Sequence, residues 1–218
     1  MAEDIGLALK DGWEAPITSQ WGKYIPGIEI DLTGADPSIA RPRDIFDVIG
    51  DRNDTTPWSN PIDGTRVRAT DPAGSVASSS EYMADRLGNN HYWSTYGVGN
   101  SLVIDFDADN SGRRILPTGL FWQHTYGPSY RIQYFTVSGG NGSSLANVVW
   151  QDLKTVSDPN FLPASGVGWS DQLELVPPSE PIQYIRLTLN GVDSNNSEYL
   201  SFAEILWGGT LSPGEGGF

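Results

Sequence analysis

Glycine and proline recur along this whole chain, and their spread is the feature that most limits how it can fold. The sequence holds 25 Gly and 15 Pro among 218 residues, and they do not gather in one linker. Both residues disfavour helix interiors, because Gly loses much backbone freedom on folding and Pro lacks a hydrogen-bond donor. We therefore expect many short strands in one domain that carries an additional N-terminal arm.

Several segments alternate apolar and polar residues with the period of a β-strand. In residues 130–138, Y-R-I-Q-Y-F-T-V-S is followed by a G-G-N-G-S-S turn that is typical of a hairpin. Further strands are predicted at 101–106, 115–122, 148–153, 183–189 and 202–208. An antiparallel β-sandwich built from these strands has four predicted interior residues, Val103, Ile132, Ile185 and Ile205.

Composition excludes several classes of function. The chain has 13 Lys and Arg against 27 Asp and Glu, a net charge of −14, which repels phosphate backbones, so we expect no nucleic-acid partner. The absence of Cys removes disulfides, thiolate metal sites and Cys nucleophiles. No apolar run is long enough for a membrane helix and no basic, apolar leader opens the chain, so we expect no membrane insertion and no export signal.

Four segments resemble, in the correct order, motifs of the discoidin family, which includes the coagulation-factor C-domains and many glycan-binding modules. The first is D-R-N-D-T-T-P-W at 51–58, close to the family pattern D-G-N-x-x-T-x-W-x-S, with Arg52 in place of the family Gly and Asn60 in place of its last Ser. The others are S-L-V-I-D-F at 101–106, Q-Y-I-R-L-T-L at 183–189 and F-A-E-I-L-W-G at 202–208.

The resemblance implies a discoidin-like jelly roll, an all-β antiparallel sandwich, over residues 44–209. Residues 1–43 then form an N-terminal arm that packs on a neighbouring subunit, and residues 210–218 form a C-terminal tail. The arm has an alternative interpretation, in which its strands are the first strands of the sandwich itself.

The early loop and the closing strand of discoidin domains lie side by side, and a carboxylate there completes a Ca²⁺ site. The resemblance therefore implies a structural Ca²⁺ site, with four oxygen-bearing candidates: Asp51, Asn53, Thr56 and Glu204. Hard oxygen donors are the ligands that Ca²⁺ prefers. In the alternative, Asp51 and Thr56 only cap their own turn through side-chain to backbone hydrogen bonds.

Two runs rich in aromatic residues and His suggest a ligand site. Aromatic rings stack on the C–H faces of sugars, and planar polar groups bond their hydroxyls, so such loops suit glycans. The candidate ligand-binding residues are His91, Tyr92, Trp93, Trp122, His124 and Tyr126. The alternatives are that the aromatic residues pack in the core or in a subunit interface.

Catalysis is not expected. The two His occur without an H-E-x-x-H pattern, and no G-x-S-x-G elbow is present. A glycosidase pair could be drawn from Asp105, Asp107 and Glu81, but an acidic chain contains many such pairs by chance.

The sequence favours a non-enzymatic structural or attachment component of a larger assembly, because an arm, a tail and no export signal suit a phage decoration, neck or tail-fibre protein. Its expected partners are neighbouring subunits in a homo-oligomer or virion, and a cell-surface glycan, with the virion as its location. The alternative is a free carbohydrate-binding module of a secreted, extracellular protein that binds or degrades glycans.

Overall fold

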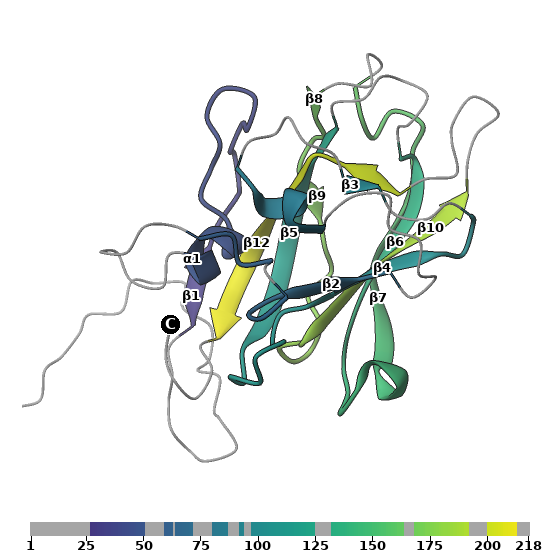
Figure 1. Ribbon diagram of the computed structural model, residues 1–218. Helices are drawn as coiled ribbons and strands as arrows, with labels where there is room; N and C mark the ends of the chain where they lie inside the picture. Colours follow the sequence, from purple (N-terminus) through teal and green to yellow (C-terminus); the bar gives the residue numbers. More distant parts are fainter. Residues whose placement is uncertain are drawn as a thin grey trace, which may run out of the picture.

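The chain folds as an antiparallel β-sandwich of two five-stranded sheets (Figure 1). This computed structural model describes residues 27–50, 59–62, 64–71, 80–86, 92–93, 97–124, 132–163, 168–191 and 200–212. The predicted all-β fold class is confirmed. Within the described residues, no helix has both the length and the apolar character needed to cross a membrane.

The first sheet has the strand order β1-β12-β5-β8, and β9 also pairs with β5. Its strands are β1 (Ile28–Ile30), β5 (Arg114–His124), β8 (Gly168–Trp169), β9 (Leu173–Glu174) and β12 (Glu204–Ser212). β1 pairs with β12 from Ile28 opposite Leu211 to Ile30 opposite Gly209. Residues 28–30 therefore belong to the sandwich, which is the alternative interpretation of the predicted arm, and the sheet extends past residue 209 to Ser212.

The second sheet has the order β2-β4-β10-β6-β7. Its strands are β2 (Arg68–Thr70), β4 (Ser101–Asp105), β6 (Tyr134–Asn141), β7 (Val149–Ser157) and β10 (Tyr184–Gly191). The predicted strand at 183–189 shows why the pattern works: Ile185, Leu187 and Leu189 join the core, and the residues between them face the other side of the sheet. We call that other side the outer face.

Short elements close the ends and one side of the sandwich. They are the helix α1 (Ile45–Gly50), the 3-10 turns η1 (Ser80–Ala84) and η3 (Leu145–Asn147), and a two-stranded sheet of β3 (Tyr92–Trp93) and β11 (Ser201–Phe202). Figure 1 shows α1 beside β12. This cover explains why most residues of β12 are buried although alternation would leave every second one exposed.

Three of the four predicted interior residues share one core. Ile132, Ile185 and Ile205 are at most 1% exposed and belong to the same hydrophobic cluster. Val103 is also buried but lies outside that cluster, because its neighbours Leu102 and Ile104 are the core-facing residues of β4. The apolar run had no alternation of its own, so it could not show which residues face inward.

The turn predicted after residues 130–138 begins later than expected, because β6 continues to Asn141. Gly139 and Gly140 lie inside β6, paired with Gln151 and Trp150 of β7. A Cβ atom on Gly139 would lie 2.3 Å from Ile182 Cδ1, and one on Gly140 would lie 2.3 Å from the carbonyl oxygen of Val149. Gly140 is therefore required for the close approach of the Val149 backbone and not for a turn, whereas a side chain at Gly139 would have to displace the end of Ile182.

Candidate functional site

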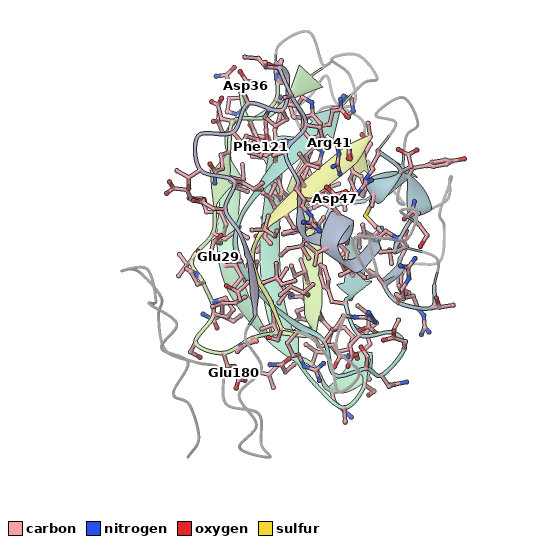
Figure 2. The ribbon with its side chains drawn as sticks, turned by 90° about the vertical axis from the view of Figure 1, so that its left-hand side faces the viewer. Glu29, Asp36, Arg41, Asp47, Phe121 and Glu180 are labelled. Carbon is pink, nitrogen blue, oxygen red and sulfur yellow. The ribbon has the colours of Figure 1, made fainter. Side chains whose placement is uncertain are left out.

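The predicted metal corner holds an arginine. Of its four candidate ligands, Glu204 is described and Asp51, Asn53 and Thr56 lie outside the described residues. Glu204 begins β12 and is 2% exposed, and its Oε1 accepts a hydrogen bond of 2.6 Å from Nε of Arg41. Figure 2 shows Arg41 and Asp47 close together beside α1 and β12.

Asp47 and Asp44 extend this ion pair into a buried cluster. Oδ2 of Asp47 accepts from Arg41 Nη1 at 2.6 Å, and Oδ1 of Asp47 accepts from Nε of Arg86 at 2.7 Å. Asp44 and Asp47 also accept each other's backbone N–H at 3.0 Å, which is a reciprocal cap at the start of α1. Oδ2 of Asp44 accepts the N–H of Trp207 at 3.3 Å, so the cluster ties α1 to β12.

Burial and charge shift the pKa values of the three carboxyl groups differently. Burial first, and the neighbouring Asp47 second, raise the pKa of Asp44 to about 8. Burial also raises the pKa of Glu204, although the charge of Arg41 partly offsets this. Burial acts in the same direction on Asp47, but hydrogen bonds from Arg41 hold the pKa of Asp47 below its usual value.

The described part of this corner does not fit Ca²⁺. The carboxylates of Glu204 and Asp47 already bind guanidinium groups, and both oxygens of Asp44 accept backbone N–H groups. In the described ranges, no group of three or more His, Asp or Glu side chains could hold a metal ion. A positive charge on Arg41 next to Glu204 would also repel a divalent cation.

Of the six predicted ligand-binding residues, two can be placed with their side chains. Trp122 is fully buried, with ring centroids 5.2 Å from those of Phe135 and Phe202, and its Nε1 donates to the carbonyl of Ser201 at 3.1 Å. His124 is also fully buried, with Nε2 3.0 Å from Oγ of Ser201. Both residues therefore belong to the interior, the alternative left open for the aromatic residues, and neither can stack on a sugar in this structure.

The other four predicted residues lie at the same end of the first sheet or outside the described residues. Tyr92 and Trp93 form β3, which pairs with β11 through Trp93 opposite Ser201, but their side chains are not described. His91 and Tyr126 lie outside the described residues. Their ligand-binding role stays a prediction.

Strand register lines up one residue from each strand on the outer face of the second sheet. Arg68 of β2 is opposite Asp105 of β4, and Asp105 is opposite Tyr184 of β10. Tyr184 is in turn opposite Gly140 of β6, and Gly140 is opposite Trp150 of β7. These five residues form a row across all five strands, which we call the Tyr184 row.

A polar pocket of about 530 Å³ opens at this row. Its walls come from β2, β4 and β10, from the turn after β4, from the start of β5, and from the loop that joins β6 to β7. The charged, amide and phenol groups that line it are Arg68, Asp105, Asp107, Asn110, Arg114, Gln183 and Tyr184. Its volume is in the range of small-molecule sites, but its walls are unusually polar for such a site.

Two carboxylates of the pocket are held by hydrogen bonds within the protein. Oδ1 of Asp107 accepts the N–H of Gly112 at 2.7 Å and that of Arg113 at 3.1 Å, and its Oδ2 accepts from Nη1 of Arg114 at 2.7 Å. Asp105 Oδ1 accepts from Gln183 Nε2 at 3.0 Å. These bonds fix the orientation of both carboxylates and occupy both oxygens of Asp107, whereas Oδ2 of Asp105 has no hydrogen-bond partner among the described residues. Glu81, the third candidate for a glycosidase pair, has no described side chain.

Tyr184 and Arg68 are two pocket residues whose donors are open among the described residues. The ring of Tyr184 is mostly buried, and among the described residues its hydroxyl has no hydrogen-bond partner. Burial first, and Asp105 second, raise the pKa of this hydroxyl, so it stays a neutral donor at physiological pH. Arg68 is exposed, and its one hydrogen bond to a described residue is a long contact of 3.5 Å with the carbonyl of Gly64.

Sequence reasoning missed this pocket. The Q-Y-I-R-L-T-L pattern correctly indicated that Tyr184 and Arg186 share one face of a strand. Neither alternation nor spacing, however, relates Tyr184 to Arg68 or Trp150, because those relations depend on the register of strands that are distant in sequence.

No protein-family model matches the chain, and no curated protein sequence does. Solved structures similar to it include the C-terminal domain of a chitobiase from Bacteroides fragilis, at 13% identity and a TM-score of 0.48 over 68% of this chain and 96% of that one. Another is a family 32 carbohydrate-binding module of a family 31 glycoside hydrolase from Clostridium perfringens. It has 17% identity and a TM-score of 0.45 over 67% of this chain and 93% of that one. A third is the family 32 module of C. perfringens NanJ in complex with galactose. It has 14% identity and a TM-score of 0.43 over 70% of this chain and 97% of that one. Such identities concern the fold alone.

Proposed function

We propose that this protein is a non-enzymatic carbohydrate-binding module whose ligand site is the polar pocket at the Tyr184 row. This is the alternative that the sequence raised. The observation that carries the proposal is that two groups with open donors meet fixed carboxylate and amide groups in one pocket. Among the described residues, the Tyr184 hydroxyl has no hydrogen-bond partner and the Arg68 guanidinium has only the long contact with Gly64.

Such a pocket suits a sugar better than other small ligands. A sugar presents many hydroxyl groups that both donate and accept, and the pocket offers donors on Tyr184 and Arg68 and an acceptor on Asp105. The walls hold little apolar surface, and so an aliphatic or lipid ligand would gain little by burial. A site built to bond hydroxyls also discriminates strongly against ligands that lack them.

The non-enzymatic part of the proposal follows from the hydrogen bonds of the carboxylates. A general acid or base must exchange a proton with the substrate in the transition state. Asp107 is committed to its own turn and to Arg114, so Asp105 is the one described carboxylate of the pocket with an open oxygen, whereas glycoside hydrolysis requires two carboxyl groups. The preferred prediction from sequence, a virion component, rested on the ends of the chain, which lie outside the described residues, and it stays a prediction, as do the location and the oligomeric state.

The test is binding of the purified protein to a panel of soluble polysaccharides by affinity gel electrophoresis, followed by calorimetry with any that retard it. Tyr184→Phe removes one hydroxyl and leaves the ring, so we expect affinity to fall roughly threefold to tenfold, the worth of one hydrogen bond. The melting temperature should not change.

Tyr134→Phe is the matched control, because Tyr134 lies at the other end of the same sheet, opposite Gly191. It makes the same chemical change and should leave affinity unchanged. Equal effects of the two variants, or no binding to any polysaccharide of the panel, would overturn the proposal.

A further inference from the structure

We propose that the ligand of this site is an anionic glycan, whose carboxylate or sulfate groups are bound by Arg68 and Arg186. The inference rests on the proposed carbohydrate-binding function and gives its ligand class. It comes from two arginines that have no ion pair among the described residues.

Arg68 and Arg186 differ from three arginines of the pocket and the ionic cluster. Arg41, Arg86 and Arg114 each have a carboxylate partner within 2.7 Å. Neither Arg68 nor Arg186 has an ion pair among the described residues. In a chain with 27 acidic against 13 basic side chains, an arginine without a carboxylate is unexpected, and two of them on one face point to an outside anion.

The guanidinium of Arg186 is oriented by an aromatic ring and has no hydrogen-bond acceptor among the described residues. Its guanidinium carbon lies 4.3 Å from the centroid of the Trp150 ring, a cation–π contact that fixes the plane of the group. Its buried Nε has no hydrogen-bond partner, and no described residue accepts from its terminal nitrogens. A planar guanidinium fork with open donors matches the two oxygens of a carboxylate or sulfate.

Both arginines are on the outer face and close to the pocket. Arg186 is opposite Val103 of β4, one row along from the pair Arg68 and Asp105. β4 separates the two arginine-bearing strands, so their backbones lie about 10 Å apart across the sheet. Tyr184 lies on the same strand as Arg186, two residues away, and it lines the pocket together with Arg68 and Val103. One oligosaccharide could therefore contact all three.

Among the described residues, the carboxylates of this face form no ion pair with the two arginines. Asp107 is paired with Arg114, whereas Asp105 and Asp152 accept hydrogen bonds from the neutral side chains of Gln183 and Ser138. Burial lowers the pKa of Arg186, and the charge of Asp152 offsets this only in part. The net charge of −14 repels polyanions at long range, and so a polyanion that binds must do so through a local cationic site. Binding of an acidic glycan is thus a specific outcome for this chain.

The experiment measures binding of the full chain by calorimetry to two pairs of polymers. One pair is polygalacturonate and the same polymer with its carboxyl groups reduced to alcohols, and the other is dextran sulfate and dextran. We expect one charged polymer to bind at least roughly tenfold more tightly than its neutral form, and the pair that shows the difference tells carboxylate from sulfate recognition.

Arg68→Ala and Arg186→Ala should each reduce binding of that charged polymer roughly tenfold, and Arg186→Lys should restore little, because Lys lacks the planar fork. Lys154→Ala is the matched control: it removes an exposed cation from β7 and should change affinity little. Equal losses in Lys154→Ala and Arg186→Ala would overturn the inference. So would equal affinity for charged and neutral polymers, although that result would leave the proposed carbohydrate binding intact.

Discussion

Nε of Arg41 lies 2.6 Å from Oε1 of Glu204, and this bond joins the segment before the first helix to the start of the last strand. The two residues are 163 positions apart in sequence. The Arg41 side chain is 22% exposed and that of Glu204 is 2% exposed, so water screens the pair poorly. The guanidinium of Arg41 neutralises carboxylates that would otherwise be buried without a counter-charge.

Replacing Arg41 should therefore destabilise the protein strongly. Arg41→Ala leaves Glu204 buried without its cation and takes one of the two arginines from Asp47, and we expect a loss of about 3 kcal/mol in the free energy of unfolding. Chemical denaturation in urea measures this value. Arg68→Ala, which removes an exposed arginine that has no ion pair with any described residue, is the control and should stay within about 0.5 kcal/mol of the wild type. A loss that small for Arg41→Ala would contradict the structural role of the cluster.

The same contact predicts how the protein responds to calcium. Because the carboxylate of Glu204 already binds the guanidinium of Arg41, we expect the melting temperature to be the same in EDTA and in millimolar Ca²⁺. Differential scanning calorimetry in the two buffers checks this. A higher melting temperature in Ca²⁺ would mean that the folded protein binds Ca²⁺ in spite of the arginine, as the family resemblance implies.

Stability should fall as the pH rises above about 4. The pKa of Asp44 is raised from 3.8 to about 8 in the folded state, so between these values the folded protein holds a proton that the unfolded chain has lost. Binding of more protons by the folded state makes the free energy of unfolding decrease with pH in this window. Glu204, whose pKa is also raised, acts in the same direction, whereas the lowered pKa of Asp47 acts below this window.

Asp44→Asn removes the titration of this group and should flatten the decline. Urea denaturation at several pH values between about 4 and 8 gives the slope for each protein. The absolute stability of Asp44→Asn is not the measure, because Asn also changes the cap of α1. Parallel curves for the two proteins would show that Asp44 is ionised throughout.

The sequence was sufficient for the architecture because strand periodicity is local. Ile185, Leu187 and Leu189 can be assigned to the core from spacing alone. The same logic failed for Trp122, since Phe121 and Trp122 are both buried: both faces of β5 are covered at this point, and alternation carries no information there. An aromatic run can thus indicate a core as readily as a ligand site.

The candidate site could not be predicted for a different reason. Arg68, Tyr184 and Trp150 come from three separated segments, and their shared row depends on the register of each strand pair. Partner choice also lies outside local patterns. Nothing in the sequence near Arg41 indicates that it pairs with Glu204, while Arg68 has no ion pair among the described residues.

A pair of tryptophan substitutions separates core from binding face. Trp122→Ala should lower the free energy of unfolding by about 3–5 kcal/mol, because it empties a site packed against Phe135, Phe161 and Phe202. The folded fraction should still bind the charged polymer normally. Trp150→Ala, at a partly exposed position, should cost much less stability but weaken binding, because Arg186 loses the ring that orients it. Urea denaturation and calorimetry on both variants check this. A binding defect in Trp122→Ala alone would contradict the proposed site and favour the aromatic segments that the sequence first suggested.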